Sequence, residues 1–153
     1  MHSRIFQLST TPILKCDYID ASDFDEHWFT NEIADYVAGC DRVNAISWLT
    51  ACLAGGEIKL DAHGYYLVIH DKEKYFASVY EEFMKSVRAV QNCTLTQFAN
   101  GEFSHHVWRI KNCHDERFGF YAEFDGLMTF AQFVRMAEIG AKYYIGNALD
   151  YHS

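Results

Sequence analysis

Short runs in which apolar and polar residues alternate predict β-strands in several parts of the chain. Residues 3–9 follow this pattern and are ended by Pro12, which cannot donate to a strand ladder. Residues 57–61 and 65–70 flank an Ala-His-Gly turn and predict a hairpin. Residues 142–152 carry the apolar side chains of a last strand.

Apolar residues at helical spacing predict four or five helices between these strands. The pattern indicates helices over residues 23–38, from Asp41 to about residue 54, and between residues 71 and 92. Thr94 and Thr129 each begin a capping-box sequence with Gln three residues later, which predicts a short helix after Thr94 and another over about 130–139.

A second hairpin is predicted from residues 105–112 and 118–124. Pairing Ile110 with Phe120 places the apolar side chains of both strands on one face, and a slip by one residue would separate them. His106 then lies on the apolar face, where a hydrogen-bonded core histidine is expected.

Together these elements predict an α+β fold. We expect an antiparallel or mixed sheet of about six strands, with four or five helices packed mainly on one face. The 153 residues suit one domain, half of them are hydrophobic, and a single proline interrupts the chain. Residues 1–153 are therefore expected to form one globular domain.

The first residues lack the apolar core of a signal peptide, and no stretch reaches 18 uncharged apolar residues. We therefore expect a cytoplasmic protein that does not enter a membrane. The cysteines are odd in number and form no C-x-x-C pair, as expected of reduced thiols: Cys16, Cys40, Cys52, Cys93 and Cys113.

The net charge of −8 has an uneven distribution. Residues 16–41, the acidic segment, contain no Lys or Arg and eight acids: Asp17, Asp20, Asp23, Asp25, Glu26, Glu32, Asp35 and Asp41. The other 127 residues hold 13 basic and 13 acidic side chains, so the acidic segment alone accounts for the net charge. This charge argues against direct binding to nucleic acid or to an anionic membrane.

The sequence lacks the common signatures of catalysis and nucleotide binding. There is no P-loop, no G-x-G-x-x-G, no G-x-S-x-G and no H-E-x-x-H. No cofactor, no metal and no catalytic residue is therefore predicted. A non-enzymatic role is favoured, although an enzyme is not excluded.

An alternative site lies near the second predicted hairpin. Cys113 and His114 fall in its loop, with His105 and Tyr121 on the adjoining strands. Neighbouring loop side chains diverge, and zinc ligands are usually spaced two to five residues apart. A small enzyme or a ligand-binding or metal-binding domain with its site here remains the alternative function.

Half of the acidic segment has an ordinary structural explanation. Asp23, Asp25 and Glu26 suit the first turn of one helix, and Asp41 can cap the next. The remaining acids are interleaved with aromatic residues, which gives a candidate partner-binding set: Asp17, Asp20, Trp28, Glu32, Asp35 and Tyr36.

An acidic surface with aromatic anchors suits a basic protein partner, because charge speeds encounter and buried rings hold the complex. We therefore expect a binding or regulatory module, and such a face can also imitate a nucleic-acid backbone. A solvated face that only aids solubility is the competing interpretation.

Three short stretches carry a resemblance to known proteins. They are residues 3–9 with Pro12-Ile13, His27-Trp-Phe-Thr, and Ile33-Ala-Asp-Tyr-Val37. The first forty residues resemble small acidic proteins of unassigned function from Gram-positive bacteria and their mobile elements. The resemblance implies a bacterial cytosolic protein and brings no activity, ligand or catalytic residue.

Overall fold

The computed structural model describes residues 2–112 and 117–153 and shows an α+β fold with seven strands and six helices in those residues. The strands are β1 (His2–Ser9), β2 (Tyr36–Gly39), β3 (Gly56–Asp61), β4 (Gly64–Ile69), β5 (Phe118–Ala122), β6 (Gly126–Thr129) and β7 (Tyr143–His152). The helices are α1 (Trp28–Glu32), α2 (Arg42–Cys52), α3 (Lys72–Gln91), α4 (Leu95–Ala99), α5 (Ser104–Asn112) and α6 (Phe130–Met136). Two short 3-10 turns precede α1, namely η1 (Lys15–Asp17) and η2 (Ala21–Phe24).

The strands form one mixed sheet in the order β3-β4-β7-β1-β5-β6, and β2 also pairs with β7. The pairing of β1 with β5 is parallel, and the other pairings are antiparallel. Along one edge, β7 pairs with β4 near its start and with β2 near its end, and along the other edge it pairs with β1. The last strand in the sequence is thus a central strand of the sheet.

Alternation along β1 divides the apolar residues between the two faces of the sheet. Phe6 and Leu8 belong to the larger core, which α2, α6 and the first turns of α3 cover. Ile5 belongs to a smaller core on the other face, which residues 19–34 cover. Most of the helical packing is therefore on one face, while residues 19–34 of the acidic segment lie over the other.

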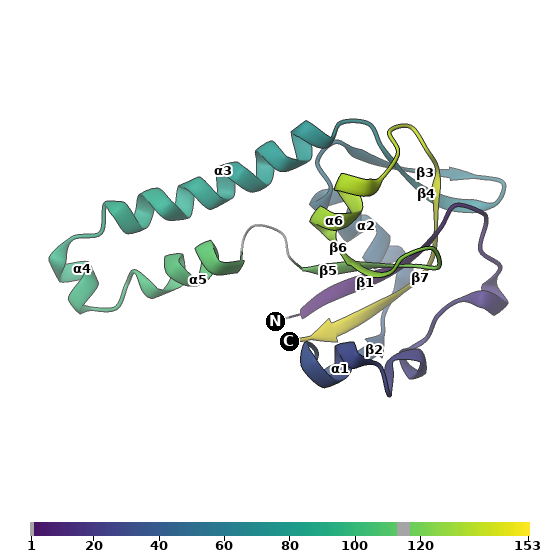
Figure 1. Ribbon diagram of the computed structural model, residues 1–153, viewed down its shortest axis with the longest axis horizontal. Helices are drawn as coiled ribbons and strands as arrows, with labels where there is room; N and C mark the ends of the chain where they lie inside the picture. The colour runs from purple at the N-terminus through teal and green to yellow at the C-terminus, as the bar shows by residue number, and fades with distance from the viewer. Residues whose placement is uncertain (1, 113–116) are drawn as a thin grey trace.

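Residues 72–112 form a helical arm that leaves the sheet (Figure 1). The helix α3 runs outward, α4 lies at the tip, and α5 returns beside α3 and packs against it. Within residues 72–112 only Tyr75 and Ser86 are buried. At the tip, the Phe98 and Phe103 rings stack with their centroids 4.8 Å apart.

Several sequence predictions are confirmed. The strand over residues 3–9, the helix after Asp41, the first hairpin and the helix between residues 71 and 92 are all present. Both capping boxes form: the Thr94 and Thr129 side chains accept from the backbone N–H three residues later, and a Gln side chain returns the bond.

The predicted helix over residues 23–38 is wrong. The segment instead contains the end of η2, the short helix α1 and the strand β2. Its last part pairs with β7, with Tyr36 opposite His152. Pairing with an available sheet edge outweighed the helical spacing of the apolar residues, because β-structure depends on tertiary partners.

The predicted second hairpin is also wrong. Residues 104–112 form the helix α5, and β5 pairs with β1 and β6 instead. Phe103, His106 and Ile110 are the half-buried residues of this stretch, which is a helical spacing. His106 is therefore not a core histidine, and Arg109 pairs with Glu82 on α3 at 3.7 Å.

Candidate partner-binding surface

The acidic segment is fastened to the sheet by the buried side chain of Gln7 on β1. Its Oε1 accepts hydrogen bonds from the N–H groups of Ile19 and Asn147, at 3.1 and 3.2 Å, and its Nε2 donates to the Asp17 carbonyl at 2.8 Å. The Asn147 side chain donates to the Ile19 carbonyl at 2.7 Å. These bonds fix where the segment crosses the second face of the sheet.

Apolar side chains then hold the rest of the segment against the same face. Phe24 and Phe29 are almost fully buried, and the Phe29 ring meets the Tyr151 ring edge-on at 5.0 Å. Ile19 and Ala34 join the same cluster. Because these residues point inward, the carboxylates between them are forced outward, and all eight acidic residues are exposed.

Three of the eight carboxylates cap turns. The Asp20 side chain accepts from the hydroxyl and backbone N–H of Ser22, and the Asp23 side chain accepts from the Asp20 N–H. The hydrogen bonds from Ser22 hold the pKa of Asp20 below its ordinary value. Asp41 caps α2, as the sequence predicted. Asp20, which was assigned to a partner, therefore also has a structural role.

A surface hollow of about 290 Å³ opens beside the end of the acidic segment. It is lined by Ala21, Asp25, Thr30, Asn31, Asp35, Tyr36 and Val37. Two carboxylates and one phenol ring thus share a single hollow. Carboxylates can neutralise the charge of a basic side chain, and an aromatic ring can cover its apolar part.

His152 on β7 positions two of these groups. Its Nδ1 lies 2.8 Å from Oδ2 of Asp35, and its ring stacks on the Tyr36 ring with centroids 5.9 Å apart and planes 6° apart. The Asp35 side chain is still 71% exposed, and Tyr36 is 47% exposed. The sheet therefore fixes both residues while leaving them exposed to solvent.

The other predicted partner-binding residues do not line this hollow. Trp28, at 44% exposure, begins α1 and rests its ring edge-on against Phe118. Glu32 ends the same helix, one turn further on. Asp17 lies in η1, where its backbone carbonyl binds Gln7. Asp25 was not predicted to bind a partner, because the sequence pattern placed it in the first turn of a helix.

The alternative site is not assembled by the residues that the structure describes. His105 is exposed on α5, where its ring stacks on Trp108. Tyr121 lies on β5 against Phe24. His105 therefore belongs to the helical arm and Tyr121 to the sheet. Cys113 and His114 lie outside the described residues. Residues 2–112 and 117–153 contain no group of three metal-type side chains placed to hold an ion.

A polar cluster that sequence reasoning missed joins the β3–β4 turn to the start of β7. Oδ2 of Asp61 accepts from the Tyr144 hydroxyl at 2.9 Å and from Lys142 Nζ at 3.1 Å, and Oδ1 accepts from the His63 N–H at 2.8 Å. The bond from the His63 N–H and those from Tyr144 and Lys142 lower the pKa of Asp61 to about 2.

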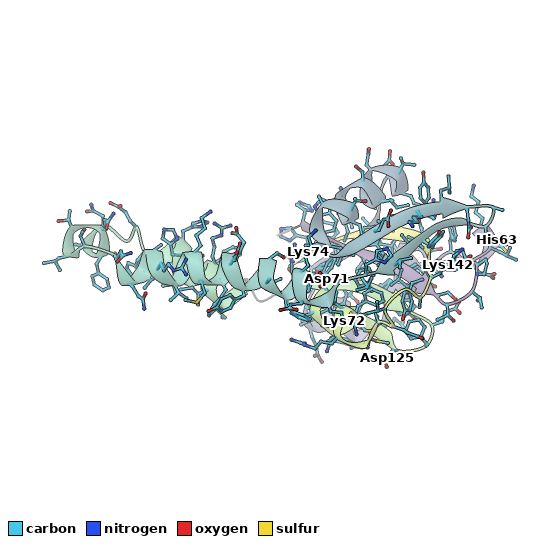
Figure 2. The ribbon with its side chains drawn as sticks, turned by 90° about the horizontal axis from the view of Figure 1, so that it is seen from above. His63, Asp71, Lys72, Lys74, Asp125 and Lys142 are labelled. Carbon is cyan, nitrogen blue, oxygen red and sulfur yellow. The ribbon has the colours of Figure 1, made fainter. Side chains whose placement is uncertain are left out.

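This polar cluster is structural in character. Lys142 Nζ also lies 4.4 Å from the centre of the Tyr66 ring, so the Lys142 side chain is held between a carboxylate and a ring. Figure 2 shows His63 at the end of the molecule opposite the helical arm, and Asp71, Lys72 and Lys74 where the arm begins. The cluster therefore fastens the first hairpin far from the arm.

Comparison of the chain with protein-family models, with curated proteins and with solved structures found no match. Among the described residues, no helix is both long enough and apolar enough to cross a membrane.

Proposed function

We propose that this protein is a non-enzymatic binding module that presents the acidic segment to a basic protein partner. The observation that carries the proposal is the hollow that Asp25, Asp35 and Tyr36 all line. A lysine or arginine side chain of the partner fits its chemistry, and arginine fits best. Its planar guanidinium binds carboxylates through two parallel hydrogen bonds and stacks on an aromatic ring.

The charge around the hollow supports the same partner. The acidic segment holds eight carboxylates and no Lys or Arg, and all eight residues are exposed. Such a field accelerates encounter with a basic protein and repels phosphate groups, so direct binding to nucleic acid is not part of the proposal.

Trp28 and Tyr36 supply the anchoring surface. Both rings are nearly half exposed, yet each rests on a fixed neighbour, Phe118 for Trp28 and His152 for Tyr36. Rings that are already ordered lose little conformational freedom on binding, which favours them as anchors. A cytoplasmic location is part of the proposal, and the free thiols of Cys16, Cys40 and Cys93 support it.

The proposal is tested by titrating the protein with a fluorescent arginine-rich peptide at several salt concentrations. Asp25→Asn with Asp35→Asn should weaken binding about 2- to 30-fold, since two exposed ion pairs contribute about 0.2–1 kcal/mol each. The salt dependence of binding should decrease in parallel. Tyr36→Ala should weaken binding, and Tyr36→Phe should retain most of it.

The matched control removes two carboxylates from the β5–β6 turn, with Glu123→Gln and Asp125→Asn, because both residues are exposed there. Equal loss of affinity in the control would show that only the net charge matters. Unchanged affinity in the Asp25 and Asp35 variant would reject the hollow as the site.

A further inference from the structure

The helix α3 has an exposed face on the side away from α5. Ser86 of α3 is buried, so it lies on the opposite side of the helix from this face. At 3.6 residues per turn, Ala77, Met84 and Arg88 lie roughly half a turn around the axis from Ser86. These three, with Tyr80, Glu81, Glu82 and Lys85, line a surface hollow of about 450 Å³.

This face carries apolar side chains among charged ones, and no element of the described residues covers it. Tyr80 is 62% exposed, and Ala77 and Met84 lie beside it along the hollow. Because the arm leaves the sheet, neither the sheet nor α5 covers this side of α3 (Figure 1). A helix face of this kind can pack against another helix at an interaxial distance of about 8–10 Å.

Two opposite charges on this face, Glu81 and Arg88, can pair between two copies of the helix. Glu81 and Arg88 lie seven residues apart, which is two helical turns, so they share one stripe. Within the described residues neither side chain forms an ion pair, whereas the neighbouring Glu82 pairs with Arg109 at 3.7 Å. Two copies of α3 in antiparallel orientation, crossing near Met84, place Glu81 of each copy opposite Arg88 of the other. A parallel pair would instead place like charges together.

We propose that α3 binds α3 of a second copy of this chain in an antiparallel, two-fold symmetric pair. Met84 then lies at the centre of the interface, two Glu81–Arg88 ion pairs flank it, and Tyr80 of each copy packs beyond the ion pairs. A two-fold axis suits this face, because each copy must present the same patch to the other. The surface is separate from the acidic segment, so the pairing does not depend on the proposed partner.

The pairing should be weak and dependent on concentration. The helix is about 30 Å long, and one of its faces buries less surface than a standard protein interface. Sedimentation velocity over a wide concentration range at low salt should therefore show monomer and dimer in exchange. A chain that stays monomeric at millimolar concentration would overturn the proposal.

Charge reversal tests the orientation directly. Glu81→Arg or Arg88→Glu alone places like charges opposite each other at both ion pairs, and each should raise the dimer dissociation constant about tenfold. An equal mixture of the two variants restores opposite charges at both positions and should dimerise about as well as the unmodified chain. A mixture no better than either variant alone would reject antiparallel pairing.

The doubly reversed chain, Glu81→Arg with Arg88→Glu, should also recover dimerisation. Lys74→Glu is the matched control, because it reverses one charge on α3 outside the hollow, and it should leave the dissociation constant within about twofold. Dimers that resist Arg88→Glu, with helicity unchanged by circular dichroism, would show that another surface pairs the chains.

Discussion

The side chain of Gln7 on β1 occupies the space that a side chain at Gly146 on β7 would need. A Cβ at position 146 would meet Oε1 of Gln7 and lie 2.7 Å from its Cδ. The same Oε1 accepts from the N–H groups of Ile19 and Asn147. The absence of a side chain at position 146 therefore lets Gln7 hold the acidic segment on the sheet.

Gly146→Ala should destabilise the protein by about 1–3 kcal/mol, because the added methyl group overpacks a buried hydrogen-bonded site. Urea denaturation would measure the change. Gly39→Ala is the control, since a Cβ at that strand position meets nothing within 4 Å. Equal stability of the two variants would contradict the close approach of Gln7 to Gly146.

Gln7→Ala should cost about 1–3 kcal/mol, because it leaves the buried N–H groups of Ile19 and Asn147 without their acceptor. It should also loosen the chain around η1 and speed tryptic cleavage after the exposed Lys15. Limited proteolysis with mass spectrometry would measure the cleavage rate. Gln91→Ala, at an exposed position on α3, should change neither quantity.

The two capping boxes offer a matched pair of substitutions. Thr129→Ala should lower the free energy of unfolding by about 0.5–2 kcal/mol, because Thr129 is buried and starts a helix packed in the main core. Thr94→Ala removes the same cap at the exposed arm tip, so it should reduce local order there and barely move the global transition. Equal global losses would show that the arm and the sheet unfold as one unit.

The Asp61 cluster predicts a dependence of stability on pH. The pKa of Asp61 is lowered from 3.8 to about 2 in the folded protein, so its stabilising effect is present above about pH 4 and is lost as the pH falls toward 2. Denaturation of the unmodified protein and of Asp61→Asn should therefore differ most above pH 4 and converge near pH 2. Tyr144→Phe, which removes one donor, should show a smaller effect of the same sign. A difference that does not vary with pH would count against the cluster.

The sequence predicted elements whose local pattern and tertiary role agree. Asp41, Thr94 and Thr129 supply caps that act within one helical turn, so they are visible without knowledge of the fold. The stretch 105–112 is different, because it is short enough for His106, Trp108 and Ile110 to fit an alternating pattern. Only its packing against α3 shows that the helical spacing of His106 and Ile110 is the relevant one.

The candidate surface was partly predictable for the same reason. The concentration of charge, and Asp35 and Tyr36 within it, follow from the sequence alone. The roles of Asp25 and His152 do not, because the hollow depends on a strand that pairs residue 36 with residue 152. Predicting a helix over residues 23–38 excluded this strand pairing. Gln7 is distant in sequence from residues 17 and 19, and no local pattern indicates that it binds them.

The central position of β7 has a consequence for how the chain folds during synthesis. The strands β1, β2 and β4 all pair with residues 143–152, so each keeps an open edge until that strand is available. The pairing of β1 with β7 joins residues about 140 positions apart, and contacts this distant in sequence make folding slow. Until β7 has paired, the open edges of β1, β2 and β4 are exposed to incorrect pairing with other strands.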